Sequence, residues 1–257
     1  MASHPSTEEA ATKKIAIVTG AAGTLGESIT RMLLDEGYLV AALDNRTEGL
    51  AGLRTRLDDK ADRLHPFTVD ISSAPAVEEV CHTILTRFGA VSVLVNNAGL
   101  LSKNKCVETN LAEWRRVIHV NLDGAFFLSQ QLLPCMRLMH YGRIVNITSM
   151  AAKTGGVTAG TAYAVSKGAL SSLTFSLARE TARDGITVNG IAPAYVKTPM
   201  VMDQLTEEQR EQVLANIPVG RFCEAEEVAH TVRFLISPLA GFITGELIDQ
   251  NGGYHMD

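Results

Sequence analysis

This sequence of 257 residues is informative first for what it lacks. No stretch approaches the roughly 18 consecutive apolar residues that a transmembrane helix needs. The first 13 residues are polar and have no apolar core like that of a secretory signal. We therefore expect residues 1–13 to be a flexible tail on a cytoplasmic protein that has no membrane partner.

Cysteine is scarce and poorly spaced for metal or redox chemistry. Cys81, Cys106, Cys135 and Cys223 are all far apart in the chain, and the seven histidines form no HExxH motif. A zinc site or a redox pair needs ligands two or three residues apart. The sequence predicts reduced, packed thiols and no required metal.

An excess of positive charge is also missing. The formal net charge is -5, so there is no overall basic field to attract nucleic acid or an anionic membrane. This balance leaves a small molecule as the expected partner. An anionic substrate remains compatible with it, because such a ligand needs only a local cation.

What is present fits one large α/β domain over residues 14–257. Hydrophobic residues make up 46% of the chain and charged residues 20%, without repeats, low-complexity runs or linkers. Short apolar runs alternate with segments of helical periodicity. The expected strands span about Ile15–Thr19, Tyr38–Leu43, His65–Val69, Val91–Val95, Arg143–Thr148, Thr187–Ile191 and Glu246–Asp249. The expected helices span about Leu25–Glu36, Ala76–Phe88, Leu111–Met139, Ala162–Arg183 and Glu224–Ile236.

The strands are continuous apolar runs, which is typical of a parallel sheet buried on both faces. Strands that alternate with helices predict a Rossmann-type, doubly wound sheet of about seven parallel strands. Ligands of such sheets bind beyond the carboxyl ends of the strands. The residues that follow each strand are therefore the candidates for function.

A glycine-rich turn, TGAAGTLG, follows the first strand and opens a helix. Glycines allow a tight turn, let a phosphate approach the backbone, and let the helix pack close to the strand. The positive end of the helix dipole then faces the pyrophosphate. We assign Gly20, Thr24, Leu25 and Gly26 to a dinucleotide site.

Acidic and amide residues follow the next strands. Asp44 ends the second strand, near the roughly 20-residue spacing of an acid that binds the adenosine ribose. A carboxylate there favours NAD and repels the 2′-phosphate of NADP, although Arg46 could soften that preference. The third strand ends before Asp70 and Ile71; Asp70 could reach the adenine amino group or lie at a helix N-cap. Asn97, Ala98 and Gly99 follow the fourth strand, where small residues would let the adenosine half lie against the backbone.

The chemistry is predicted at Ser149, Tyr163 and Lys167. Four residues on a helix span about 400°, so Tyr163 and Lys167 share one face. A nearby cation favours the phenolate and would bring the pKa of Tyr163 toward neutral pH for proton transfer. Ser149 follows the fifth strand and could hydrogen-bond a substrate oxygen as charge develops there. Lys167 could also hold the nicotinamide ribose.

Taken together, TGAAGTLG, NNAG, VNLDGAF, NITS and YAVSK resemble the short-chain dehydrogenase/reductase family, in its compact single-domain branch. The resemblance covers nearly the whole chain. It implies hydride transfer at a nicotinamide ring and adds Asn121 to a catalytic tetrad, holding a water that links Lys167 to solvent. It also implies that Pro193, Val196 and Thr198 lie in a cofactor loop, with Val196 and Thr198 at the nicotinamide amide.

Three positions depart from the usual pattern of that branch. Thr24 stands where the middle glycine of the turn is common, Ala194 follows Pro193 in place of glycine, and Cys223 also replaces a common glycine. The spacing TGxxGxxG is typical of the longer branch that holds sugar-nucleotide epimerases, but those chains lack this NNAG. We keep the compact branch and expect Ala194 and Cys223 to leave the chemistry untouched.

Substrate contacts are expected from residues 100–105, 150–162 and 199–212, the last being a mobile lid with a helical stretch. Lys153 is expected either to be solvated or to meet an anionic substrate. The first-ranked function is an NAD-dependent dehydrogenase of a secondary alcohol, polyol or sugar. The alternative is an NADPH-dependent reductase of 3-oxoacyl thioesters on acyl-carrier protein or coenzyme A, and the remote alternative is an inactive nucleotide-binding regulator. By resemblance, the two long helices over 111–139 and 162–183 pair between subunits in a homotetramer.

Overall fold

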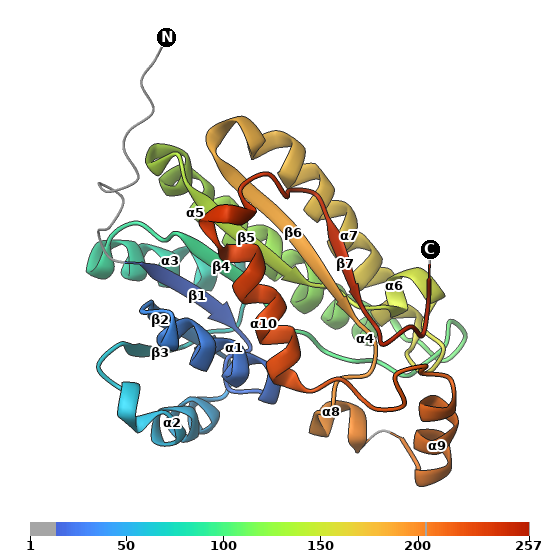
Figure 1. Cartoon of the computed structure of the whole chain (residues 1–257). Helices are drawn as coiled ribbons and strands as arrows, with labels where there is room; N and C mark the ends of the chain where they lie inside the picture. Colours follow the sequence, from blue (N-terminus) through green and yellow to red (C-terminus); the bar gives the residue numbers. More distant parts are fainter. Residues whose placement is uncertain (1–13, 204, 257) are drawn as a thin grey trace.

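A computed structural model describes residues 14–203 and 205–256, so the predicted tail over 1–13 lies outside the described residues. These residues form a parallel sheet of seven strands in the order β3-β2-β1-β4-β5-β6-β7, with helices on both faces (Figure 1). The strands are β1 (Ile15–Thr19), β2 (Leu39–Asp44), β3 (Leu64–Thr68), β4 (Val93–Asn96), β5 (Gly142–Ile147), β6 (Ile186–Pro193) and β7 (Leu247–Gln250). The predicted doubly wound sheet is confirmed.

The central strands are buried along their whole length. Every residue of β1, β4, β5 and β6 is buried. This is why their sequences read as continuous apolar runs, because a parallel sheet is covered on both faces. The order reverses between β1 and β4, which opens a crevice at the carboxyl ends of these strands, where such sheets bind ligands.

Helices α1 (Thr24–Asp35), α2 (Thr47–Arg56) and α10 (Ala225–Ile236) cover one face of the sheet, and their apolar residues share one core cluster. Helices α3 (Ala74–Phe88), α5 (Gly124–Met139) and α7 (Thr161–Thr181) supply the cluster on the other face. The remaining helices are α4 (Leu111–Ile118), α6 (Ala151–Thr154), α8 (Pro199–Met202) and α9 (Glu207–Ala215).

The single helix predicted over 111–139 is broken. Helix α4 ends at Ile118, a π-helical turn spans His119–Asp123, and α5 begins at Gly124. Apolar periodicity runs through all three segments, so the sequence pattern hides the extra residue in that turn. Turns of this kind are rare and gather at functional sites. Helix α2 was not predicted, because its apolar face is narrow.

Gly26 lies where α1 packs closest to the glycine turn. A Cβ added there would lie 2.1 Å from the Gly20 carbonyl oxygen and 2.8 Å from the Ala21 Cα, so the helix would have to move. We predict that Gly26→Ala lowers the free energy of unfolding by about 1–3 kcal/mol. Urea denaturation followed by circular dichroism measures it.

Gly168 is the matched control, because a Cβ there meets no atom within 4 Å outside its own helix, α7. Gly168→Ala should stabilise the protein by about 0.5–1 kcal/mol through helix propensity. Equal effects of the two substitutions would contradict the close approach at Gly26.

Candidate functional site

The glycine turn is held by the residues that follow β4. The Asn97 side-chain amide donates to the Thr19 carbonyl oxygen at 2.9 Å and to that of Gly20 at 3.2 Å. The Ala98 N–H donates to Thr19 Oγ1 at 2.9 Å. Gly20 has a φ of +62°, and a Cβ there would lie 2.9 Å from the Ala98 Cα. The NNAG and TGAAG segments are therefore one unit.

The start of α1 has the features of an anion site. Gly23 is the N-cap and offers no side chain to the first turn, which begins with Thr24, Leu25 and Gly26. The first N–H groups of a helix have no partner within it, and the helix dipole favours a negative group there. The turn therefore fits a pyrophosphate.

Asp44 lies beside this turn at the end of β2. Its carboxylate accepts from the backbone N–H groups of Ala22 and Arg46, both at 3.1 Å. The Arg46 Nε lies 3.1 Å from the same carboxylate; the Asp44 side chain is 4% exposed and that of Arg46 is 59% exposed. The Asp44 carboxylate is thus fixed at the glycine turn, and the exposed Arg46 guanidinium pairs with it.

Asp70 and Ile71 follow β3 and differ in environment. Asp70 is exposed. Its Oδ1 accepts from the Ser72 N–H at 3.0 Å and from the Ser72 hydroxyl at 2.7 Å. The N-cap of α3 is Ser73, so the N-cap interpretation of Asp70 is wrong. Ile71 is buried against Gly124, where an added Cβ would lie 2.7 Å from its side chain.

Tyr163 and Lys167 lie one turn apart near the start of α7. The Lys167 Nζ is 5.8 Å from the centre of the Tyr163 ring and donates to the Ile147 carbonyl oxygen, at the end of β5, at 2.7 Å. Ser149 follows the same strand and is buried, with its Oγ accepting from the Ala151 N–H at 3.1 Å. The structure thus brings these three side chains together.

Burial sets the protonation of the pair. It lowers the pKa of Lys167 from 10.5 to about 8, which leaves the ammonium charged at neutral pH. It raises the pKa of Tyr163 above 10, against the opposing effect of a hydrogen bond with Ser149. We predicted that the cation would bring this pKa down; in the ligand-free protein burial raises it instead, and the phenol keeps its proton.

Asn121 lies in the π-helical turn and is buried. Its Oδ1 accepts from the Leu100 N–H at 2.7 Å, and its Nδ2 donates to the Leu100 carbonyl oxygen and to Ser166 Oγ, both at 3.0 Å. A Cβ on Gly99 would lie 3.4 Å from the Lys167 Nζ and 3.5 Å from the Asn121 Oδ1. Asn121 and Lys167 therefore border the same small space.

A cavity of about 350 Å³ opens beside Ser149 and Tyr163. Its lining is mainly apolar and comes from the segments that follow β4, β5, β6 and β7. The lining residues are Leu101, Lys103, Ser149, Met150, Ala151, Thr154, Gly156, Val157, Thr158, Ala159, Tyr163, Ala194, Tyr195, Val201, Leu205, Gln209 and Tyr254. All three predicted substrate segments contribute to this cavity.

Two features of the cavity differ from the sequence analysis. Lys153 pairs with Asp249, its Nζ lying 2.6 Å from Asp249 Oδ2, and it is not among the lining residues; the lysine in the lining is Lys103. Tyr195 and Tyr254 form a wall, with ring centres 5.7 Å apart, and were missed as substrate contacts. No local motif marks Tyr254, which reaches the site only because the chain folds back after β7.

The loop after β6 carries Pro193, Val196 and Thr198. The Pro193 carbonyl oxygen accepts from the Met150 N–H at 2.9 Å. Val196 is buried and forms an isolated parallel bridge with Cys223, and Thr198 is the N-cap of α8. The predicted cofactor loop therefore lies next to the cavity and is attached to the segment that precedes α10.

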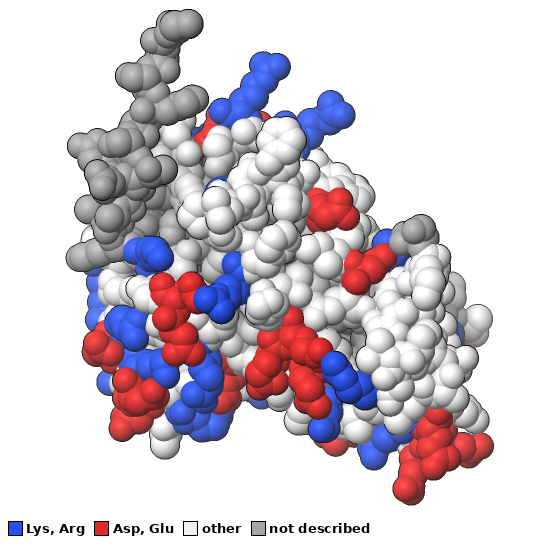
Figure 2. Space-filling view, in the orientation of Figure 1, with Lys and Arg blue, Asp and Glu red and all other residues white. Residues whose placement is uncertain are grey.

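Other classes of site are not evident in the described part of the chain. No helix in it is long and apolar enough to cross a bilayer, and no group of three or more potential metal ligands gathers there. Positive and negative side chains are interspersed over the face in Figure 2. That metal and nucleic acid play no part stays a prediction.

Comparisons with known proteins give the class and then the family. A family model described as enoyl-(acyl carrier protein) reductase matches residues 20–255. Together with the sheet and the site, this match defines a nicotinamide-dependent oxidoreductase. The chain belongs to the short-chain dehydrogenase/reductase family.

Several similar proteins are named for the same activity, that of a 3-oxoacyl-[acyl-carrier-protein] reductase. The chain is 35% identical over 240 residues to a 3-oxoacyl-[acyl-carrier-protein] reductase of Thermotoga maritima, covering 93% of this chain and 97% of the relative. It is 36% identical to a reductase of the same name from Staphylococcus aureus, covering 95% and 98%. A crystal structure of a short-chain dehydrogenase/reductase from Brucella melitensis, named glucose/ribitol dehydrogenase, matches with a TM-score of 0.88 at 32% identity, covering 96% and 98%.

Proposed function

We propose that this protein interconverts 3-oxoacyl and 3-hydroxyacyl thioesters with a nicotinamide cofactor. The sequence analysis ranked a dehydrogenase of a secondary alcohol, polyol or sugar first. The relatives named as 3-oxoacyl reductases favour the alternative, and we reverse the order. The observation that carries this proposal is a mainly apolar cavity with Ser149 and Tyr163 in its wall.

The cavity suits an acyl chain better than a polyol. Leu101, Met150, Val157, Val201 and Leu205 present apolar side chains to it. Burial of a hydrocarbon chain against them contributes about 25 cal/mol per Å² of apolar surface. A sugar or polyol would need a hydrogen-bonding partner for each hydroxyl that it buries, and the surface exposed in this cavity is more apolar than polar.

In this proposal Tyr163 is the general acid in reduction and the general base in oxidation. A bound nicotinamide supplies or accepts the hydride. Tyr163 donates its proton to the carbonyl oxygen, and the Ser149 hydroxyl stabilises the negative charge that develops there. The raised pKa of Tyr163 in the ligand-free protein keeps the proton available before reaction.

Lys167 and Asn121 support that proton transfer. The charged Lys167 Nζ stabilises the phenolate that Tyr163 leaves behind, and the hydrogen bond to Ile147 fixes its position. Asn121 borders the same space and is fixed through Leu100 and Ser166. We assign it to a water-mediated path that returns a proton from solvent.

The residues around the glycine turn fit the cofactor. We assign the pyrophosphate to the turn and first helical residues, Gly20 and Thr24–Gly26. Asp44 would hold the adenosine ribose, and Asp70 and Ile71 would hold the adenine. Asn97–Gly99 would contact the adenosine half, and the loop over 193–198 would hold the nicotinamide amide.

Substrate choice is tested by comparing acetoacetyl-coenzyme A with a panel of secondary alcohols, polyols and sugars. We expect reduction of the thioester by the purified protein, measured as loss of reduced-cofactor absorbance. Faster turnover of a polyol or a simple secondary alcohol with NAD would favour the second candidate. That candidate is supported by Asp44 and by the name of the similar Brucella protein.

Replacing Tyr163 tests whether the protein is an enzyme or an inactive nucleotide-binding scaffold. Tyr163→Phe should lower kcat by about 10²–10⁴-fold, because the general acid is lost, and should leave cofactor binding nearly unchanged. Steady-state kinetics and cofactor fluorescence measure the two effects. Tyr141→Phe is the control, since Tyr141 lies at the opposite end of β5; unchanged turnover in Tyr163→Phe would remove Tyr163 from the mechanism.

The lowered pKa of Lys167 gives a pH dependence. The ammonium is charged below about pH 8 and neutral above it. We predict that kcat/KM for carbonyl reduction is level near neutrality and falls as the pH rises past about 8. A profile measured from pH 6 to 10 checks this, and a limb that appears only above pH 10 would contradict the burial of Lys167.

For the cofactor we propose a preference for NAD(H) over NADP(H), set by Asp44. A 2′-phosphate beside this buried carboxylate meets like charge, so NADPH should bind roughly 10–100-fold more weakly than NADH. Fluorescence titration measures both dissociation constants. Arg46→Ala should widen the difference, because Arg46 is the cation able to turn toward the phosphate; tighter binding of NADPH would overturn the assignment.

Assembly as a homotetramer remains a prediction. The helices expected to pair between subunits carry exposed apolar side chains, among them Trp114, Phe126, Val165 and Phe175. Solvent-exposed apolar groups of this number are compatible with burial against another copy.

A further inference from the structure

The loop assigned to the nicotinamide amide has few attachments of its own. Its start is held by the Met150 N–H, which donates to the Pro193 carbonyl oxygen at 2.9 Å. On either side of Val196 its backbone bonds to Cys223: the Cys223 N–H donates to the Tyr195 carbonyl oxygen at 2.9 Å, and the Lys197 N–H donates to the Cys223 carbonyl oxygen at 2.8 Å. A further bond, from the Ala194 N–H, reaches the Gln250 carbonyl oxygen at 3.2 Å. The position of Val196 therefore depends on the position of Cys223.

The space behind this loop is not filled. A cavity of about 130 Å³ lies there, lined by Ala194, Tyr195, Ile217, Val219, Arg221, Cys223, Glu227, Gln250, Asn251 and Gly252. The Val196 side chain packs in the main core cluster, but the loop has no close packing on the side of this pocket. On that side the backbone bonds to Cys223 restrain it.

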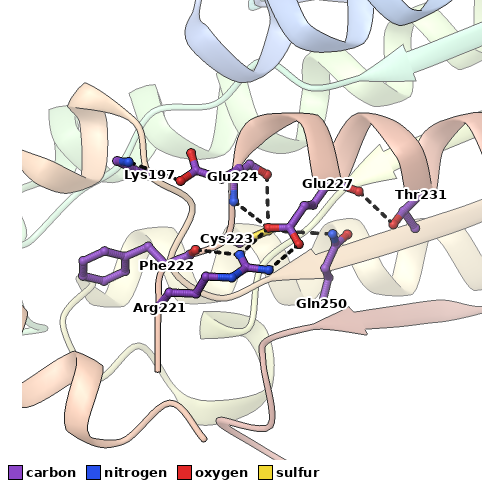
Figure 3. A network of polar contacts seen from close by, with 8 residues as sticks. All are labelled: Lys197, Arg221, Phe222, Cys223, Glu224, Glu227, Thr231 and Gln250. Atoms are coloured by element: carbon purple, nitrogen blue, oxygen red, sulfur yellow. Dashed lines mark hydrogen bonds and ion pairs between the residues drawn. The ribbon is translucent and has the colours of Figure 1, made fainter. Parts of the chain in front are cut away.

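The segment around Cys223 is held in turn by a bidentate pair between Arg221 and Glu227. Arg221 donates through its two terminal nitrogens to the Glu227 carboxylate, at 2.7 and 2.8 Å, and also donates to the Phe222 carbonyl oxygen at 3.1 Å (Figure 3). Glu227 lies in the first turn of α10 and accepts from the Glu224 N–H at 2.9 Å. Helix α10 thereby holds the segment on both sides of Cys223.

This pair is too exposed to be explained by stability. The Arg221 side chain is 53% exposed and that of Glu227 is 40% exposed. Exposed ion pairs add little to the free energy of unfolding, because water and salt screen them. A bidentate arginine–carboxylate pair instead provides fixed geometry.

We propose that Arg221 and Glu227 are positioning residues for the nicotinamide half of the cofactor. They act through Cys223, whose backbone sets the place of Val196, and they touch neither cofactor nor substrate. This inference rests on the proposed function, because it takes the loop over 193–198 as the nicotinamide site. Cys223, which the sequence analysis set apart from the chemistry, is the link.

The test compares two probes, NADH and ADP-ribose, which lacks the nicotinamide. Arg221→Met removes the bidentate pair with Glu227 and leaves the hydrogen bond between Glu227 and the Glu224 N–H in place. We expect the dissociation constant of NADH to rise about tenfold and that of ADP-ribose to stay unchanged. Fluorescence titration measures NADH, and calorimetry measures ADP-ribose.

Arg221→Lys keeps the positive charge but cannot form the bidentate pair. It should weaken NADH binding as much as Arg221→Met does. Glu227→Gln combined with Arg221→Met should weaken NADH binding no further than Arg221→Met alone, because the two residues act as a unit. Arg137→Met is the matched control. Arg137 is 43% exposed and pairs with Glu180 and Asp184 near the amino ends of β5 and β6, and its loss should leave both probes unaffected.

Three results would overturn the proposal. Unchanged NADH binding in both Arg221 variants would do so, as would equal weakening of NADH and ADP-ribose. Loss of the folded state in both variants, seen by circular dichroism, would assign the pair a structural role. If wild-type protein binds neither probe, the proposed function itself fails; if wild type binds NADH and the variants match it, only this inference fails.

Discussion

The structure of the site depends on one buried cation. Lys167 has its Nζ bonded to the Ile147 carbonyl oxygen at the end of β5, and it lies one helical turn from Tyr163. An uncompensated ammonium in the protein interior is costly, and its pKa falls accordingly. A fold retains such a group when its charge is needed, and here it faces a phenol that keeps its own proton. The pair is therefore ready to give up that proton to a substrate oxygen and to bear the charge left behind.

The sheet supplies the rigidity that this arrangement requires. Thr19 ends β1, and Asn97 and Ser149 follow the neighbouring strands β4 and β5; the bonds of Asn97 tie the glycine turn to the loop after β4. The π-helical turn then brings Asn121 to the space beside Lys167. The lid and the loop bound to Cys223 lie farther out. The chemistry is thus carried by short, buried connections, while ligand recognition is assigned to longer ones.

Much of the fold followed from the sequence because its signals are local. Continuous apolar runs gave β1, β5 and β6 to within one or two residues, and the spacing of Tyr163 and Lys167 placed both on one helical face. The extra residue of the π-helical turn has no local signature, so the helix over 111–139 was predicted unbroken. The same limit applies to Tyr254 and to the contact between Lys153 and Asp249, since both depend on how the chain folds back after β7. The direction of the Tyr163 pKa shift also needed coordinates, because burial is its largest cause.

The central claim is that Tyr163 is a protonated, half-buried phenol beside a charged Lys167 before reaction. Nuclear magnetic resonance of ring-labelled tyrosine, with Tyr163→Phe to identify the signal, measures its titration in the ligand-free protein directly. The account predicts that Tyr163 titrates above pH 10, because burial raises its pKa. A titration near or below pH 8 in the absence of cofactor would contradict it.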